Sequence, residues 1–441
     1  MTGAAAAARL RDTLLRQTVA WCVANSSYYR GRFPSPDQFG GLDDLPALPV
    51  LFREQVVEHH AEIRCDPDVP AAIQHTTGTT GAFLELYRSA AEQAFVWEFF
   101  MAQLLAKPAP EVRRLHLNLV NAYHGALTAM PSSAYVLSAG VYDRAQASQA
   151  RGLLERRYDM PGVEERVSVV MGTERMVKAL TAYLLDDGYD MAGSPVTAVV
   201  LFGGHVTPAR KRLLGQLWGA GVQDLYSLTE LFGGATECGI GGPWVFDPHV
   251  IPEVVDPVTH EPIEQGMGVL LLTGLYPFMQ QMPLVRYWTN DLVEIVAPAS
   301  DPSGLQVRYL GRLPRSVIGR TGEPLLLSGP LYEIVESIAD VAVTARFPDL
   351  GGGSSPGLEL TGDHHYAVDH SVVDEVDVIT VTLGLRYAPW LYPDRAVVLE
   401  AEVAGRLLAA HPALARAVAR GAADLRVRLE PAGAVAPYDS K

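Results

Sequence analysis

Apolar and polar positions along the 441-residue chain alternate between helix-like and strand-like spacing in a definite order. Residues 8–24 carry apolar side chains at helical spacing on two neighbouring stripes, which predicts an amphipathic helix docked on a core. The stripes are Leu10, Leu14 and Trp21, and Leu15, Val19 and Cys22. Residues 166–172 and 196–204 are short β-branched runs that stop at glycine, with a helix-like segment between them. We therefore expect a βαβ unit in an α/β sheet, whose ligands bind at the loops beyond the strand ends.

The pattern changes after residue 300 and predicts a second, smaller α+β domain. Residues 373–387 alternate like a half-exposed strand, and residues 397–410 are typical of a helix that stops before His411-Pro412. The joint is expected within residues 301–314, which are rich in Gly, Pro and polar side chains. Residues 351–357, GGGSSPG, are expected to form a surface loop.

Composition and charge exclude several classes of protein. With 48% hydrophobic and 19% charged residues the chain is globular, and a net charge of −15 lacks the basic footprint of nucleic-acid binding. No apolar run is long enough to span a membrane, and Arg9, Arg11 and Asp12 interrupt any signal-peptide pattern. Three cysteines without CxxC spacing favour a reducing compartment. We expect a cytoplasmic protein that works without nucleic acid or membrane.

A first candidate site is the segment HTTGTTG, which begins at His75. Two glycines among hydroxyl residues expose backbone N–H and O–H donors, an arrangement that suits phosphate. The donors and glycines are Thr76, Thr77, Gly78, Thr79, Thr80 and Gly81. Because Ala82 follows and no lysine is present, this is not a P-loop. The alternative is an ordinary polar turn.

Two further segments place polar groups at strand ends. One strand ends at Gly203-Gly204, and the next ends at Tyr226-Ser227-Leu228-Thr229-Glu230. An aromatic ring, a hydroxyl and a carboxylate delivered together can stack a base, bind phosphate and hold Mg²⁺. Asp291 stands at the edge of the apolar strand in residues 282–295. The alternatives are a plain surface strand end, and a cap or turn residue for Asp291.

Taken in order, these segments resemble the adenylate-forming enzymes, and within them the phenylacetate–CoA ligase-like branch. That branch carries a TSGTTG or SSGTTG loop, a YGxTE-like segment and a PxxRYxTxD segment. The corresponding segments of this chain are TTGTTG, YSLTE and PLVRYWTND. The resemblance is strongest over residues 70–295 and weak after 315. It implies an α/β fold with a large N-terminal ATP- and acid-binding domain, 1–310, of mixed sheets and helices, and a small mobile α+β C-terminal lid, 311–441.

The resemblance implies that ATP and a carboxylic acid form acyl-AMP and pyrophosphate, and that the acyl group then passes to an acceptor. The implied cofactors are ATP, Mg²⁺ and coenzyme A. The threonine–glycine loop would hold the β- and γ-phosphates, Tyr226 would stack on adenine beside Gly203 and Gly204, and Asp291 and Arg312 would bind the ribose. Thr229 would contact the α-phosphate, Glu230 would bind Mg²⁺, and the C-terminal Lys441 would be the catalytic ammonium. His124, Gly125 and Gly172 would line the acid pocket, although a core histidine is an equal alternative for His124.

Several positions depart from the family pattern. Ala82-Phe83 replace the usual Lys-Pro, and we expect Arg88 to supply the missing positive charge. Pro314 stands at the usual hinge position, where its fixed φ predicts a moved hinge or a reduced swing of the lid. Lys441 is the last residue and is expected to lie in a frayed tail.

The leading hypothesis is an acid–CoA ligase for an aromatic or related acid. Alternatives are an amide-forming ligase, a diazotase-like enzyme that activates a non-carboxylate, and an inactive nucleotide-binding relative. Cys238 and His249 could begin a zinc site, although only Cys65 offers a further ligand. A homodimer is compatible with the sequence, which does not fix the oligomeric state.

Overall fold

The computed structural model describes residues 3–66, 70–77, 83–95, 98, 112–119, 134–300, 304–347, 350 and 356–438. The chain divides into two compact units. Unit 1 comprises Met1–Leu180, Tyr189–Thr289 and Glu294–Arg308, and unit 2 comprises Thr181–Gly188, Asn290–Val293 and Tyr309–Lys441. The chain passes into the main part of unit 2 between Arg308 and Tyr309, within the joint expected over residues 301–314. The predicted boundary after residue 310 stays a prediction.

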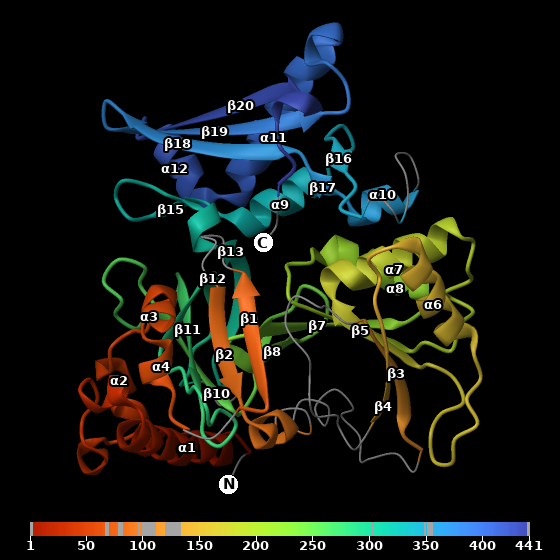
Figure 1. Cartoon of the computed structure of the whole chain (residues 1–441). Helices are drawn as coiled ribbons and strands as arrows, with labels where there is room; N and C mark the ends of the chain where they lie inside the picture. The colour runs from red at the N-terminus through yellow and green to blue at the C-terminus, as the bar shows by residue number, and fades with distance from the viewer. Residues whose placement is uncertain are drawn as a thin grey trace. The chain divides into compact units, whose positions relative to one another are not determined.

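A large mixed sheet, which starts in unit 1, contains eleven strands within the described part of the chain (Figure 1). Their order across the sheet is β10-β11-β12-β13-β9-β8-β7-β6-β5-β3-β4. Their bounds are β3 (Arg114–Leu119), β4 (Ala134–Ala139), β5 (Val169–Thr173), β6 (Ala198–Phe202), β7 (Gly221–Leu228), β8 (Leu231–Glu237), β9 (Trp244–Phe246), β10 (Val250–Val255), β11 (Met267–Gly274), β12 (Tyr287–Ala297) and β13 (Gln306–Arg312). Strands β4, β3, β5, β6 and β7 are parallel, whereas β7, β8, β9 and β13 pair antiparallel. The carboxyl ends of the parallel strands therefore meet at one edge.

The predicted βαβ unit is confirmed. Strand β5, helix α7 (Glu174–Asp186) and parallel strand β6 follow one another, and β5 is buried along its whole length. Helices α6 (Arg144–Glu155) and α8 (Pro208–Trp218) pack on the same part of the sheet (Figure 1). Continuous β-branched runs form such strands because helices cover parallel sheets on their faces.

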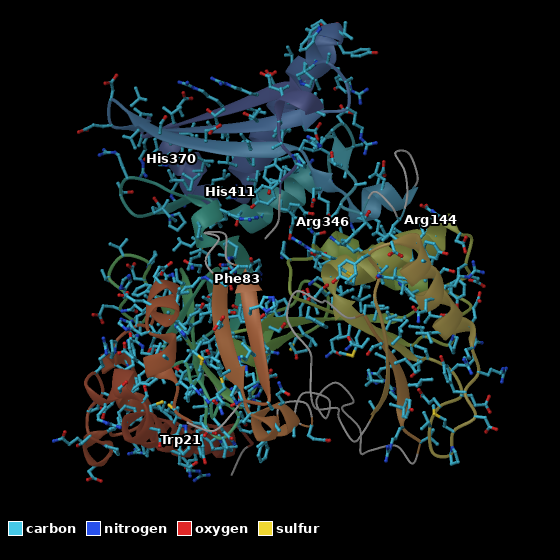
Figure 2. All side chains as sticks on the ribbon, in the orientation of Figure 1. Trp21, Phe83, Arg144, Arg346, His370 and His411 are labelled. Carbon is cyan, nitrogen blue, oxygen red and sulfur yellow. The ribbon has the colours of Figure 1, made fainter. Side chains whose placement is uncertain are left out.

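The N-terminal helix is also confirmed, as α1 (Gly3–Asn25). Its core stripe is Leu15, Val19 and Cys22, each wholly buried, whereas Leu10 of the other predicted stripe is half exposed. Trp21, labelled in Figure 2, donates its ring N–H to the Gln280 carbonyl at 3.0 Å. The short elements that follow are α2 (Ser27–Arg30), η1 (Pro36–Gln38), η2 (Leu42–Ala47), α3 (Arg53–Glu58) and α4 (His60–Ile63).

A separate hairpin carries the threonine–glycine segment. Strands β1 (Ala72–Thr77) and β2 (Phe83–Arg88) pair antiparallel, with Thr77 opposite Phe83 and Ala72 opposite Arg88. Residues 78–82 connect these two strands and lie outside the described residues. Arg88 is therefore at the end of the hairpin remote from the connection.

Unit 2 has its own core between a small sheet and helices. Strand β19 (Val376–Leu385) lies between antiparallel β18 (Tyr366–Val373) and parallel β20 (Ala423–Pro431), and helices α9 (Ser328–Glu336), α11 (Pro393–Ala410) and α12 (Pro412–Ala419) contribute to the core. The smaller elements are η4 (Leu313–Arg315), β14 (Val317–Ile318), β15 (Pro324–Leu326), β16 (Val343–Thr344), α10 (Pro356–Thr361), β17 (Asp363–His364), η6 (Pro389–Leu391) and η7 (Ala432–Ala434).

Unit 2 differs from the sequence-based expectations in one strand and one loop, and agrees with them at the end of one helix. The strand predicted over 373–387 is central and mostly buried rather than half exposed, because β18 and β20 flank it and helices cover it. The predicted helix end is confirmed at Ala410, and His411 (Figure 2) bonds the Leu407 carbonyl at 2.8 Å. Of the predicted loop 351–357, residues 351–355 are outside the described residues, and Pro356 and Gly357 begin α10 instead.

The fold class is confirmed as α/β, with a large mixed sheet and a smaller α+β unit. Among the described residues, no helix has both the length and the apolar character that a membrane span needs.

Candidate active site

Gly203-Gly204 and Tyr226 meet at the carboxyl edge of neighbouring parallel strands. Phe202, the last residue of β6, is in register with Leu225, so the glycines follow directly beside Tyr226. Gly203 has φ of +79°, which turns the chain out of the sheet. The Tyr226 ring packs edge-on against Trp244 at 6.2 Å, and Gly234 lies so close that a Cβ would stand 2.6 Å from the Tyr226 carbonyl oxygen. The structure thus brings together Gly203, Gly204 and Tyr226, which are the predicted base-binding residues. Trp244 and Gly234 pack against the tyrosine.

Thr229 and Glu230 form the tight turn between β7 and β8, with Leu228 paired to Leu231. The strand end predicted here is confirmed. The Glu230 side chain is only 11% exposed, and its Oε1 accepts bonds from Arg53 Nη1 at 3.2 Å and Tyr287 OH at 3.0 Å. Burial, together with the Glu230 carboxylate, raises the pKa of Tyr287 well above its usual range, so this hydroxyl stays a donor.

Arg88 is wholly buried and holds the Thr229-Glu230 turn from behind. Its Nη2 donates to the carbonyl oxygens of Thr229 at 2.6 Å and Glu230 at 3.0 Å, and its Nε donates to Gln74 Oε1 at 3.2 Å. Burial lowers the pKa of Arg88, and the carboxylates of Glu92 and Glu230 oppose that shift. The expectation that Arg88 supplies charge to the leaving pyrophosphate is therefore wrong: its guanidinium is committed to backbone carbonyls inside the core.

A buried ionic cluster lies directly behind the tyrosine strand. Lys211 of α8 contacts Asp224 of β7 at 2.8 Å and Glu237 of β8 at 2.6 Å, and all three side chains are at most 6% exposed. The Lys211 ammonium also lies over the Trp244 ring at 5.6 Å. Burial is the main cause that raises the pKa of Asp224 to about 6. The sequence did not single out these residues, although Asp224 stands two positions before Tyr226.

The predicted ribose pair lies within unit 2. Arg312 Nε stands 3.4 Å from Asp291 Oδ1, and Asp291 is 2% exposed. Asn290 has φ of +63°, a conformation that asparagine tolerates better than most residues, and it redirects β12 just before Asp291. Tyr309 lies beside this pair, and burial raises its pKa well above the usual range. The sequence did not predict a role for Tyr309.

Two backbone bonds of Arg312 are made to serines of unit 2. Its N–H donates to Ser328 Oγ at 2.8 Å, and Ser316 Oγ donates to its carbonyl at 2.8 Å, on either side of Pro314. A rotation centred on Leu313-Pro314 would strain these bonds. The moved or reduced hinge stays a prediction.

Other predicted residues are placed only in part or not at all. Thr76 and Thr77 end β1, whereas Gly78, Thr79, Thr80, Gly81, His124, Gly125 and Lys441 lie outside the described residues. The tail is ordered at least to Tyr438, whose ring stacks on Tyr366 at 4.2 Å. The fraying expected at Lys441 lies outside the described residues and stays a prediction.

Gly172 does not leave room for a substrate ring. A Cβ at this position would stand 2.8 Å from Leu119 Cβ and 3.2 Å from the Leu119 carbonyl oxygen. The glycine is needed for the close approach of β5 to β3. The missing Cβ therefore makes no space for a ring, and the place of Gly172 in the acid pocket stays a prediction.

The candidate zinc ligands do not converge. Cys238 is exposed, His249 is buried beside the Phe278 ring, and Cys65 is buried beside Cys22. No group of three potential metal ligands occurs in the part of the chain that the structure describes.

Glu230 is suited to bind Mg²⁺ in a nucleotide site, where the ion needs few protein ligands. Magnesium commonly takes one or two protein carboxylates and completes its shell with phosphate oxygens and water. Both described hydrogen bonds to the Glu230 side chain are on Oε1, and the residue stands in the turn that follows β7. Its chemistry and position suit an ion brought by the nucleotide.

The comparisons with known proteins agree on one fold and one group of relatives. The phenylacetate–coenzyme A ligase of Thermus thermophilus is 25% identical over 342 residues, which cover 73% of this chain and 72% of the relative. The enzyme of the same name from Pseudomonas putida is 32% identical over 128 residues, which span only 27% of its length. No family model matches the chain.

Solved structures match over almost the whole chain. A 2-hydroxyisobutyryl-CoA ligase, described in complex with its acyl-AMP and CoA, covers 97% of this chain and 89% of its own, with a TM-score of 0.66 at 15% identity. The chain has the fold of the adenylate-forming acyl-CoA ligases. An ATP-bound RpMatB-BxBclM chimera also matches, with a TM-score of 0.52 at 16% identity over 82% of this chain and 65% of its own. The predicted resemblance to adenylate-forming enzymes, and to their phenylacetate–CoA ligase-like branch, is confirmed.

Proposed function

We propose that this adenylate-forming chain is an ATP-dependent ligase that activates an aromatic or related carboxylic acid as acyl-AMP and transfers the acyl group to coenzyme A. The observation that carries the proposal is the sheet edge where Gly203-Gly204, Tyr226 and the Thr229-Glu230 turn converge. Its similarity to phenylacetate–CoA ligases along 73% of the chain supports the type of substrate. We further propose cytoplasmic action without a nucleic-acid or membrane partner, and a homodimer as the state to test first.

The first half-reaction joins two anions, because a carboxylate attacks the α-phosphorus of ATP and pyrophosphate leaves. Such a step needs charge neutralisation and fixed geometry rather than a covalent intermediate on the protein. Tyr226 would stack on adenine, Thr229 would donate to the α-phosphate, and Glu230 would hold Mg²⁺, which when bound neutralises phosphate charge. Arg53 and Tyr287 orient the Glu230 carboxylate through Oε1.

Asp291 and Arg312 would bind the ribose hydroxyls. A carboxylate accepts bonds from both hydroxyls, and the guanidinium at 3.4 Å orients that carboxylate. Thr76, Thr77 and residues 78–81 would bind the outer phosphates, and Lys441 would approach the reacting carboxylate and α-phosphate. These roles rest on the family resemblance.

The acid would lie on the face of the sheet opposite Tyr226. Successive residues of a strand point to opposite faces, so Leu225 faces away from Tyr226 and α8. It joins Val169, Met171 and Val200 in a compact apolar cluster, against which Phe202 packs at the carboxyl edge. This position brings an apolar acid to the edge where the α-phosphate would be held.

The direct test is acid-dependent exchange of labelled pyrophosphate into ATP across benzoates, phenylacetates, cinnamates and fatty acids, followed by an acceptor screen. We expect exchange with an aryl or arylacetic acid, and thioester formation on adding CoA. If none of the acids supports exchange, the proposal is rejected and an inactive relative is favoured. Exchange without thioester formation would favour the amide-forming or other non-CoA alternatives.

Tyr226→Ala is expected to raise the KM for ATP by about 10- to 100-fold, because one stacked base contributes about 1–3 kcal/mol. The KM for the acid should change little, since the ring lies on the opposite face from the apolar cluster. Tyr226→Phe, which keeps the ring, is the matched control and should retain the wild-type KM. Equal loss for ATP and acid would argue against adenine stacking.

Lys441→Ala is expected to reduce adenylation by at least about 100-fold and to leave thioester formation from added acyl-AMP nearly intact. The reason is that charge between the carboxylate and the α-phosphate matters only in the first half-reaction. Both half-reactions can be followed separately by pyrophosphate release and by CoA thioester formation. Equal loss in both would contradict this role.

A further inference from the structure

The strand ladder beside the turn that follows β7 is irregular. Ser227 pairs with Gly234, but the next pair is Leu228 with Leu231, so the register shifts between Ser227 and Leu228. Such bulges disrupt the ladder locally, re-aim side chains and are common next to active sites. Regular strand pairing therefore does not by itself fix the orientation of this turn.

Arg88 holds the turn at two successive peptide units. Its Nη2 donates to the carbonyl oxygen of Thr229 and to that of Glu230, the next residue. Because each peptide unit is planar, holding these two carbonyl groups restricts the backbone dihedral angles of Glu230, which lies between them, and so the direction of its Cα–Cβ bond. Arg53 and Tyr287 orient the carboxylate at the other end of the same residue. Glu230 is thus held at both its backbone and its side chain.

The guanidinium of Arg88 is itself held by a buried network. Its Nε donates to Gln74 Oε1 at 3.2 Å, and its Nη1 lies 3.9 Å from Glu92 Oε1, with both charged side chains wholly buried. Glu92 Oε2 in turn accepts the backbone N–H groups of Gln280 at 2.6 Å and Gln281 at 3.0 Å. A guanidinium that is buried among such partners has little freedom to rotate, so it is a rigid support for the turn.

Resting on the proposed function, we propose that Arg88 is a positioning residue for adenylation, which directs the Glu230 carboxylate toward the metal-bound phosphates by holding the turn. It acts on the nucleotide through the turn. A shift of about 1 Å in a positioned group can cost about 100-fold in rate. The demand is largest in the first half-reaction, where Mg²⁺ and the leaving pyrophosphate must be held together. Acyl transfer from acyl-AMP has no pyrophosphate to hold and should depend on Arg88 much less.

Arg88→Lys tests the proposal with the intact enzyme, because an ammonium keeps the positive charge but lacks the planar fork. We expect kcat for acid-dependent pyrophosphate exchange to fall by about 10- to 100-fold. The KM for the acid should change by less than about 2-fold, and thioester formation from added acyl-AMP should fall by less than about 3-fold. Equal losses in the two half-reactions would overturn the inference.

Arg64→Lys is the matched control. Arg64 packs over the ring of Tyr87, the residue before Arg88 on the same strand, at 5.1 Å, and it donates to Gln281 Oε1 at 3.0 Å. This variant makes the same chemical change beside the same strand and should leave the ratio of the two half-reactions as in wild type. A change in that ratio as large as in Arg88→Lys would contradict a role specific to Arg88.

A binding measurement tests the inference without any turnover. Calorimetry in the absence of acid compares ATP with AMP, each with and without Mg²⁺. Mg²⁺ should tighten ATP binding to wild type, and in Arg88→Lys this gain should be about 10-fold smaller while the Kd for AMP stays within about 3-fold. An unchanged gain would show that Arg88 does not position the metal carboxylate. If no acid supports exchange, the proposed function fails, and this binding measurement still decides the inference.

A compensated variant separates positioning from stability. Arg88→Met combined with Glu92→Gln removes both buried charges and keeps an oxygen for the N–H groups of Gln280 and Gln281. It should fold, as circular dichroism would show, and yet stay low in exchange and in the Mg²⁺-dependent gain in ATP binding. If both recover to wild-type values, Arg88 is only the charge partner of Glu92 and the inference is wrong.

Discussion

Glu230→Gln is expected to lower kcat/KM for acid-dependent pyrophosphate exchange by at least about 100-fold, because the amide keeps the shape of the side chain but loses the charge that would hold Mg²⁺. The amide oxygen can still accept from Arg53 and Tyr287, so the turn should keep its geometry. The measurement is exchange rate against Mg²⁺ concentration, and the variant should need more Mg²⁺ for half-maximal rate.

Tyr287→Phe is the matched control for this prediction. It removes one of the two described bonds to Oε1 and leaves the carboxylate in place. We expect a loss of less than about 10-fold, with little change in the Mg²⁺ requirement. If Glu230→Gln retains near wild-type activity, or if the tyrosine variant is equally impaired, Glu230 is not the metal carboxylate.

Lys211→Met is expected to destabilise the protein by about 3–5 kcal/mol near neutral pH, because it leaves two buried carboxylates without their counter-ion. Asp224 and Glu237 lie on paired strands, and both contact this one ammonium. Urea denaturation of variant and wild type at about pH 5 and about pH 8 measures the loss.

The pH dependence of this loss follows from the pKa of Asp224. Its pKa in the folded state, about 6, is above the ordinary value of 3.8, so the folded protein holds this proton more tightly than the unfolded chain does. The stabilisation that comes from holding the Asp224 proton is fully present at pH values below the ordinary pKa of 3.8, and it is lost as the pH rises through about 6. Without the ammonium the pKa of Asp224 should rise further, so the penalty of Lys211→Met should be smaller at about pH 5 than at about pH 8.

Asp224→Asn in the Lys211→Met background is the control, because it removes one of the two opposed charges. It should recover part of the lost stability at about pH 8. A loss that is the same at both pH values, and that the second substitution does not reduce, would show that the packing of the lysine stem and not its charge is responsible.

Much of the fold could be predicted because its signals are local. The runs before Gly172 and Gly203 are typical of buried parallel strands, and β5 and β6 occur there as a βαβ unit. The helix that ends at Ala410 was predicted from the proline after His411. The misjudged strand, β19, differs because its burial depends on β18 and β20 on either side, which no local alternation reveals.

The sequence predicted the site residues that belong to motifs, but it did not predict the residues outside the motifs that contact them. Tyr226, Thr229 and Glu230 stand together in one short segment, and the structure places them on one strand and its turn. Arg53 is 177 residues from Glu230 and belongs to no motif, so only the fold reveals their contact. Tyr287 lies in the PLVRYWTND segment, but its contact with Glu230, 57 residues away, depends on the fold and not on the motif.

Arg88 and Gly172 show where residue type alone misleads. An arginine after a phosphate-binding segment suggests a charge for the leaving group, but Arg88 is wholly buried and bonds the carbonyls of Thr229 and Glu230. A small residue suggests open space, but Leu119 fills the volume beyond Gly172. Both corrections come from packing across strands that are distant in the sequence.

The central claim is that a carboxylate oxygen of the acid attacks the α-phosphorus of ATP. The most direct measurement uses an acid whose carboxyl group carries a heavy oxygen isotope, with ATP, Mg²⁺ and CoA, followed by mass spectrometry of the nucleotide and phosphate products. The account predicts AMP that contains one heavy oxygen, unlabelled pyrophosphate and an acyl-CoA. ADP together with labelled inorganic phosphate, or AMP without label, would contradict it.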